Sequence, residues 1–332
     1  MDDYTDMVLD SFERYELETF LIGIRPPEDV LNSEEQLWEE YGIEWTEPIK
    51  TELSRLIGKK LEEEKDIEVD FKRPDINAVV DMQKDRVELQ VNSLLIYGQY
   101  NKYSREIPQT EWPCNNCHGS GCDECDWTGK QYQESVQEII QEPFIQKTKG
   151  IDAKFHGGGR EDINVKCFGK REFVLEIREP LKRDLDLKEI QENLNSKQDK
   201  VEVFNLKYTH KDKIEEIKEK RADKTYKAEI HLSEDVNEEK LADLEKLVGE
   251  VEQDTPNRVE HRRADKTRKR EVKEVSYKKL ENKKIELKVK AEAGTYIKEL
   301  IHGDEGRTQP NVADLLDTEA ECKKLDVMEI EK

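Results

Sequence analysis

The chain has 332 residues, enough for about two domains of ~150 residues each, so its core does not depend on disulfides. Charged residues make up 40% of the chain, mean hydropathy is −0.96, and no apolar run approaches the ~18 residues of a membrane span. The N-terminus, MDDYTDMVLD, is acidic, whereas a signal peptide begins with basic residues. We therefore expect a cytoplasmic protein without a membrane partner.

The chain carries 56 basic and 78 acidic residues, a net charge of −22 at pH 7. Taken alone, this charge argues against a nucleic-acid partner, because lysine and arginine drive phosphate binding. Binding depends on the local field, however, and a salt-rich cell interior favours acidic protein surfaces whatever their task. We interpret the acidity as a property of the cytoplasm rather than of the substrate.

The first part of the chain predicts a small α/β layer. Residues 1–14 have the pattern of a helical lead-in, and 15–24 alternate as a half-buried strand does. Residues 47–62 carry apolar side chains at helical spacing, and strands are predicted at 76–82 and 86–95. A unit of this size and order is consistent with an accessory domain.

The later part of the chain predicts a larger α+β region with one sheet flanked by helices. The expected strands are 173–177, 201–208, 224–232, 272–278 and 284–291, and the expected helices are 187–194 and 237–250.

Four of the six cysteines are clustered in two Cys-x-x-Cys pairs, Cys114 with Cys117 and Cys122 with Cys125. Each pair can direct two thiolates at one point, and four thiolates satisfy the tetrahedral preference of Zn²⁺. Disulfides are rare in a reducing cytoplasm, and a redox Cys-x-x-Cys is not usually doubled. The spacing predicts a structural zinc site, although only four residues separate the two pairs.

The densest polar signature is the turn 157–165, GGGREDINV. Its glycines do not have the spacing of a phosphate-binding loop. Two interpretations remain open. The turn could carry only solvated charges, or Asp162 could be a functional carboxylate kept ionised by the neighbouring Arg160.

Two further segments carry candidate residues. In 294–300, GTYIKEL, Thr295 has the position of a helix N-cap, and Lys298 in the first turn is one possible ion partner for an aspartate. The segment 256–273 contains eight basic and three acidic residues, a reversal of sign within an acidic chain. Such a strip is either a solvated face or a phosphate-binding surface, and we favour contact with RNA.

Six segments in succession resemble the archaeal tRNA pseudouridine synthases that modify uridines 54 and 55 in the TΨC arm. They are 97–114 (YGQYNKYSREIPQTEWPC), 159–162 (GRED), 255–265 (TPNRVEHRRAD), 294–300, 302–308 (HGDEGRT) and 325–327 (LDV). The resemblance implies a THUMP-like RNA-binding accessory domain over 1–113, a zinc knuckle over 114–130 and a pseudouridine synthase domain over 131–332. The last would have a mixed, mostly antiparallel central sheet.

The resemblance also implies an activity and a set of site residues. The enzyme would isomerise uridine in tRNA with no organic cofactor and no obligate protein partner. Asp162 would be the nucleophile, Lys298 its ion partner, Tyr226 the ring that stacks on uracil, and Ile297 and Leu325 the apolar walls of the base pocket. Further substrate contacts would come from Arg160, Arg258, Arg262 and Arg263. Asn164 stands where such synthases commonly have a second acid, which leaves Asp162 as the only aspartate in the turn.

Two other functions compete with this one. The chain could be a non-catalytic protein that binds or chaperones structured RNA and keeps the zinc site. The Cys-x-x-Cys-x-Gly-x-Gly pattern also resembles the zinc knuckle of Hsp40 cochaperones, which bind proteins. That module has four spaced repeats and an adjacent J domain, and the sequence has neither.

Overall fold

The computed structural model describes residues 2–44, 46–258 and 264–331. The chain forms two compact units. The first comprises Met1–Ile96, Gln141–Lys154 and Leu175–Ile190, and the second comprises Tyr97–Ile140, Phe155–Val174 and Gln191–Lys332. Each unit is described by itself.

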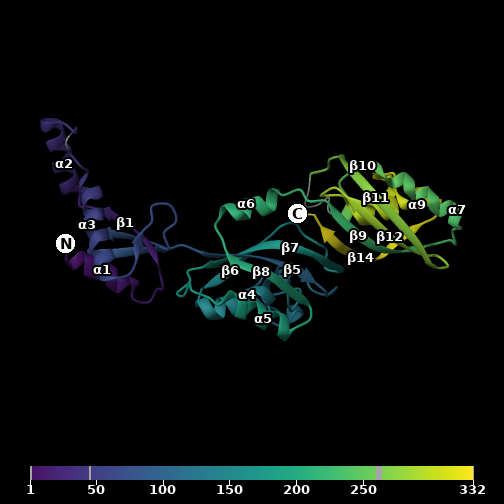
Figure 1. Ribbon diagram of the computed structural model, residues 1–332, viewed down its shortest axis with the longest axis horizontal. Coiled ribbons are helices and arrows are strands. Elements are labelled where there is room, and N and C mark those ends of the chain that lie inside the picture. The colour runs from purple at the N-terminus through teal and green to yellow at the C-terminus, as the bar shows by residue number, and fades with distance from the viewer. Residues whose placement is uncertain (1, 45, 259–263, 332) are drawn as a thin grey trace. The chain divides into compact units, whose positions relative to one another are not determined.

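The first unit is built on a four-stranded sheet in the order β2-β1-β3-β4 (Figure 1). Its elements are α1 (Asp2–Phe12), β1 (Thr19–Arg25), α2 (Glu28–Tyr41), α3 (Ile49–Glu64), β2 (Glu68–Val69), β3 (Ile76–Asp81) and β4 (Arg86–Val91). Strand β1 runs parallel to β2 and β3, and β4 closes the sheet as the antiparallel partner of β3. Every second residue of β1 is buried, and α1 and α3 pack beside the strands in one apolar core.

The predicted α/β layer is therefore confirmed, with one helix added. The sequence predicted α3 within two residues at each end but missed α2. No residue of α2 is buried, but Val30, Leu37, Trp38 and Tyr41 recur at helical spacing, so the sequence carried a signal for this helix that the prediction did not use.

The second unit contains most of a ten-stranded sheet in the order β13-β10-β11-β12-β9-β14-β7-β5-β8, with β6 paired to β7. The strands are β5 (Leu94–Lys102), β6 (Asp152–Gly157), β7 (Val165–Arg178), β8 (Val201–Tyr208), β9 (Lys224–Leu232), β10 (Gly249–Gln253), β11 (Arg268–Glu281), β12 (Lys284–Ala291), β13 (Thr308–Gln309) and β14 (Ala320–Ile330). The remaining helices are α4 (Val136–Thr148), α5 (Leu187–Lys197), α6 (Asp212–Glu219), α7 (Glu238–Leu241), α8 (Ile297–His302) and α9 (Val312–Leu316), of which α4 and α5 are divided between the two units.

Strand β14 joins the two halves of this sheet. It is antiparallel to β9 and parallel to β7, so it lies between these two strands. The pairs β10–β11, β10–β13, β11–β12 and β12–β9 are antiparallel. The expected mixed, mostly antiparallel sheet is therefore confirmed. The register places Leu325 of β14 opposite Val165 of β7, so the end of the chain lies next to the turn that precedes β7.

The segment 237–250 differs from the single helix predicted for it. Helix α7 lasts four residues and continues as a 3₁₀ helix over Ala242–Leu247, after which Gly249 begins β10 with a φ of +122°. The buried side chains are Leu241, Leu244 and Leu247. Their strict spacing of three matches the three residues per turn of a 3₁₀ helix, which aligns them on one face.

Among the described residues, no helix has both the length and the apolar character required to cross a bilayer.

Leu287 tests the core of the second unit. This residue of β12 is fully buried in the main apolar cluster. Leu287→Ala should lower the free energy of unfolding by about 2–5 kcal/mol, because the lost methyl groups leave a cavity. Leu280→Ala, at a position that is 41% exposed, is the matched control and should change it by about 0.5 kcal/mol or less. Urea unfolding followed by circular dichroism measures both, and equal losses would contradict this core.

Candidate active site

The candidate site is centred on the turn between β6 and β7. Asp162 lies in this turn, and its carbonyl accepts a hydrogen bond from the amide of Val165 at 3.1 Å. Gly159 has a φ of +91°, and a Cβ at this position would lie 2.7 Å from a guanidinium nitrogen of Arg171. Both the backbone conformation and the close approach of Arg171 require glycine here.

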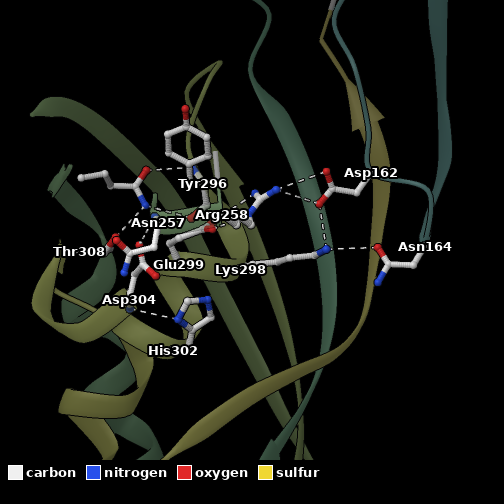
Figure 2. A network of polar contacts seen from close by, with 11 residues as sticks. Asp162, Asn164, Asn257, Arg258, Tyr296, Lys298, Glu299, His302, Asp304 and Thr308 are labelled. Carbon is white, nitrogen blue, oxygen red and sulfur yellow. Dashed lines mark hydrogen bonds and ion pairs between the residues drawn. The ribbon is translucent and has the colours of Figure 1, made fainter. Parts of the chain in front are cut away.

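Lys298 is the direct ion partner of Asp162. Its Nζ lies 2.8 Å from Oδ2 of Asp162 and 3.2 Å from Oδ1 of Asn164 (Figure 2). Lys298 comes from the first turn of α8, which packs against β14. Lys298 and Asp162 thus form the ion pair that the resemblance implied, and the side-chain oxygen of Asn164 accepts a second hydrogen bond from the same ammonium.

The Thr295 cap predicted for this helix is wrong. Tyr296 occupies the cap position without a side-chain cap, and the Thr295 hydroxyl donates to the carbonyl of Glu292 at 2.8 Å. The chain enters the helix one residue later than predicted.

Arg258 is a second cation beside the carboxylate. Its Nη1 lies 3.4 Å from Oδ2 of Asp162, while its Nε lies 2.6 Å from Oε1 of Glu299, a side chain that is only 1% exposed. Figure 2 shows Arg258 between the two acids. The buried Glu299 thus fixes the guanidinium in a position where it reaches Asp162 with one end.

These cations keep Asp162 ionised. Burial alone would raise its pKa, but the hydrogen bond from Lys298 and the positive charges of Arg258, Lys298 and Arg160 outweigh burial and hold the pKa of Asp162 below its ordinary value. Arg160, which the sequence suggested as the main neighbour, has the smallest effect of the three. The carboxylate is 41% exposed, so it remains accessible from solvent.

The neighbouring Glu161 has the opposite environment. It forms an ion pair of 2.7 Å with Arg171, and both side chains are 1% exposed. The hydroxyl of Tyr100 donates to Glu161 at 2.9 Å, and Gln109 donates to Tyr100 and to the carbonyl of Gly159. The interpretation of this turn as a set of solvated charges is therefore wrong for Glu161.

Tyr226, Ile297 and Leu325 lie on three different elements that share one apolar cluster. Tyr226 is on β9 opposite Val327 of β14, and Leu325 is opposite Val165 of β7. Ile297 begins α8, and both Ile297 and Leu325 are buried in the main apolar cluster, against which Tyr226 packs. Burial raises the pKa of Tyr226 to about 12, so its phenol is neutral at physiological pH.

Arg160 points to a different group. Its guanidinium lies over the ring of Trp112, 5.1 Å from the ring centre. Trp112 immediately precedes Pro113 and the cysteine cluster, and its ring also contacts that of Tyr132 edge to face. The turn is therefore linked to the base of the cysteine loop through Arg160.

The basic strip is only partly described. Arg262 and Arg263 lie outside the described residues, so their positions are not assigned. Within β11, Lys269 pairs with Glu250 and Glu252, and Lys273 pairs with Asp223. Local acids therefore neutralise part of the positive charge in the portion of the strip that the structure describes.

The four clustered cysteines form a candidate metal centre. All four sulfurs lie within 4.8 Å of one another, and the Cys117–Cys125, Cys114–Cys122 and Cys122–Cys125 sulfurs are 3.8, 3.9 and 3.7 Å apart. Four sulfurs at ~2.3 Å from one Zn²⁺ would be ~3.8 Å apart, whereas disulfide sulfurs are ~2.05 Å apart. The short connection between the two pairs therefore allows convergence on one ion.

Backbone amides support this arrangement. Gly121 donates to the sulfur of Cys117, and Cys122 and Gly129 both donate to the sulfur of Cys125. Burial opposes ionisation of Cys125, but these amide hydrogen bonds and those from neighbouring thiols lower its pKa to about 6. The residues present thus fit a thiolate-bound metal ion.

Sequence reasoning missed Glu299 and Arg171. Glu299 has no distinctive signal, because an acid after Lys298 in a helix is normally a surface residue. Arg171 did have a usable signal in the sequence. The period of two along β7 places it on the same face as Val165, Cys167 and Phe173, all of which are buried.

Comparison with known proteins assigns the chain to a family. The family model described as "Pus10, C-terminal" matches residues 95–331, and "Pus10 THUMP domain, archaeal" matches residues 4–81. The protein named tRNA pseudouridine synthase Pus10 of Methanothermobacter marburgensis is 44% identical, over 95% of this chain and 79% of its own length. The protein of that name from Archaeoglobus fulgidus is 39% identical, over 99% of this chain and 92% of its own length.

Solved structures give weaker likenesses. A Cbf5-Nop10-Gar1 complex contains a chain that is 20% identical, with a TM-score of 0.35 over 59% of this chain and 45% of that one. A pseudouridylate synthase is 14% identical, with a TM-score of 0.26 over 74% of this chain and 69% of that one. The family assignment comes from the sequence matches. With both family models and near full-length relatives in agreement, this chain belongs to the Pus10 family of tRNA pseudouridine synthases.

Proposed function

We propose that this chain isomerises uridine to pseudouridine at positions 54 and 55 in the TΨC arm of tRNA, with Asp162 as the nucleophile. One observation carries the proposal: the carboxylate of Asp162 is held ionised 2.8 Å from Lys298 and is open to solvent. Its support is the family to which the chain belongs, whose curated relatives are named tRNA pseudouridine synthases.

The reaction needs only the protein and the RNA. The bond between N1 of uracil and C1′ of ribose breaks, the base turns, and C5 forms a new bond to the same ribose carbon. C5 loses its proton and N1 gains one, so the product is an isomer, and neither an oxidant nor a reductant is consumed. A carboxylate can act as the nucleophile in such a step only in its ionised form.

The surrounding residues have roles that follow from their chemistry. The target uridine must leave its stack, at a cost of a few kcal/mol. Tyr226 would stack on the extruded base, Ile297 and Leu325 would provide apolar walls, and Arg160 would fill the space that the base leaves. Arg258, Arg262 and Arg263 would contact phosphates. The N-terminal unit would bind the tRNA away from the reaction.

We assign the metal of the cysteine cluster as a structural Zn²⁺. Four thiolates fill all four positions of a tetrahedral ion and leave none for a substrate. The ion would stabilise the loop that carries Trp112 and, through it, the position of Arg160.

Asp162→Asn tests the nucleophile. The variant should form no pseudouridine, because the amide cannot attack, while its dissociation constant for tRNA should stay within about threefold of the wild type. Carbodiimide-blocked primer extension on a tRNA transcript measures the product and its positions. Asp152→Asn is the matched control, since Asp152 also pairs with an arginine, Arg178, but lies outside the turn; it should retain full activity.

The same experiment separates the competing functions. Primer-extension stops of equal strength with wild type and Asp162→Asn would show that Asp162 is not the nucleophile. Stops from the wild type outside positions 54 and 55 would refute the TΨC-arm assignment. Tight tRNA binding with no stops from the wild type, across a range of salt, would favour the non-catalytic RNA-binding protein.

Tyr226 tests base stacking. Tyr226→Phe keeps the ring and should retain most of the activity, whereas Tyr226→Ala should lower the catalytic efficiency roughly 5- to 150-fold, which corresponds to ~1–3 kcal/mol for one stacked base. Single-turnover kinetics measures both. If Phe and Ala variants lose the same activity, the hydroxyl rather than the ring is required and stacking is refuted.

Metal analysis tests the cysteine cluster. The purified protein should contain about one zinc ion per chain, measured by plasma mass spectrometry, and a thiol reagent should release it. Cys125→Ser should lose the metal and melt at a lower temperature. Cys322→Ser, outside the cluster, should keep both the metal and the melting temperature. Metal-free protein that melts like the untreated protein would contradict the assignment.

A further inference from the structure

The segment 100–109, at and after the end of β5, contacts the turn from behind, almost residue by residue. Its side chains Tyr100, Lys102, Arg105 and Gln109 are called the cradle here. Gln109 donates a hydrogen bond to the carbonyl of Gly159, and Tyr100 donates one to the carboxylate of Glu161. Lys102 donates to the carbonyls of Asp162 and Ile163. Arg105 donates to the carbonyl of Asn164. The cradle thus contacts every turn residue from 159 to 164 except Arg160.

Lys102 places a buried ammonium group within the cradle. Its side chain is fully buried, and its Nζ lies 2.7 Å from the carbonyl oxygen of Ile163, 3.2 Å from that of Asp162 and 3.0 Å from that of Ile107. A lysine ammonium has three donors, and here three backbone carbonyls accept from them. No carboxylate lies within ion-pair distance of Lys102 among the described residues.

This contact acts on the backbone of the nucleophile itself. The carbonyl of Asp162 accepts from Lys102 and from the amide of Val165, so its peptide plane is held from two sides. The Asp162 side chain extends from that backbone to Lys298 and Arg258. Without the ammonium, three carbonyl dipoles would converge on one buried point with no positive charge, and the turn would be expected to rearrange.

We propose that Lys102 is a positioning residue for the isomerisation, because its buried ammonium holds the backbone of Asp162 and Ile163 in the orientation that presents the carboxylate to the substrate. This inference rests on the nucleophilic role proposed above for Asp162.

Burial disfavours the ammonium and lowers the pKa of Lys102 to about 8, although the nearby charges of Glu161 and Cys167 oppose this shift. The three backbone carbonyls are the groups that hold the buried ammonium in place.

Lys102→Met tests the inference, since methionine has a similar length and no charge. The single-turnover rate constant at saturating enzyme should fall about 100-fold, the loss expected for a misplaced reacting group, while the dissociation constant for tRNA stays within about threefold. Hydrogen exchange should become faster at the amide of Val165, and the rest of the sheet should keep its protection. Lys224→Met is the matched control, because the largely buried Lys224 donates to the carbonyl of Ala222 and not to the turn.

A second pair of variants keeps the inference testable if Lys102→Met does not fold. Lys102→Arg retains a positive charge with several donors, and Lys102→Gln retains only a neutral donor. The rate constant should be highest for the wild type, lower for Lys102→Arg and lowest for Lys102→Gln. Equal rate constants for the three proteins, or an unchanged rate constant in Lys102→Met, would overturn the inference. So would a loss of rate that is matched by equal losses in tRNA affinity and melting temperature, because that pattern indicates a merely structural role.

Asp162→Asn, assayed in parallel, separates this inference from the proposed function. An active Asp162→Asn protein overturns the proposed nucleophile and the inference with it. An inactive Asp162→Asn protein together with a fully active Lys102→Met protein overturns the inference alone.

Discussion

The ion pair between Asp162 and Lys298 joins segments that are 136 residues apart, and the geometry of the site depends on it. The two side chains are 41% and 22% exposed, and an ion pair at such a surface contributes only ~0–1 kcal/mol to stability. The pair is therefore a result of the fold and not its cause. Strand β14 brings the partners together, because it pairs with β7 on one side while α8 packs against it.

Two adjacent acids in one turn have different roles because their environments differ. Glu161 faces inward to the buried Arg171, and removing either partner would leave an uncompensated charge in the core, a change that typically costs ~3–5 kcal/mol. Asp162 faces the solvent side and is held by cations that leave it accessible. The buried pair anchors the turn, and this anchoring lets the exposed carboxylate occupy one position.

Arg258 and Arg160 are each held by a different neighbouring side chain. Arg258 is held by the buried Glu299 and reaches Asp162 with its free end, whereas Arg160 rests on Trp112 at the base of the cysteine loop. The Pro113–Lys130 bridge closes that loop, and its four sulfurs converge inside it. The conformation of the candidate metal centre is therefore linked through the ring of Trp112 to the side chain of Arg160, near Asp162.

The sequence by itself determined the features that depend on local spacing. The four cysteines lie within twelve residues, so their convergence needs only a short loop, and α3 and β9 follow from their apolar periods. It also indicated Asp162 and Lys298 as a pair, through resemblance rather than geometry. Only the tertiary structure decided that Arg258, and not the adjacent Arg160, is the main guanidinium at Asp162, and that Glu161, Arg171 and Lys102 are buried beneath it. The physical reason is that these contacts depend on strand register across up to 136 residues, and a buried charge has the same sequence signal as a solvated one until its partners are in place.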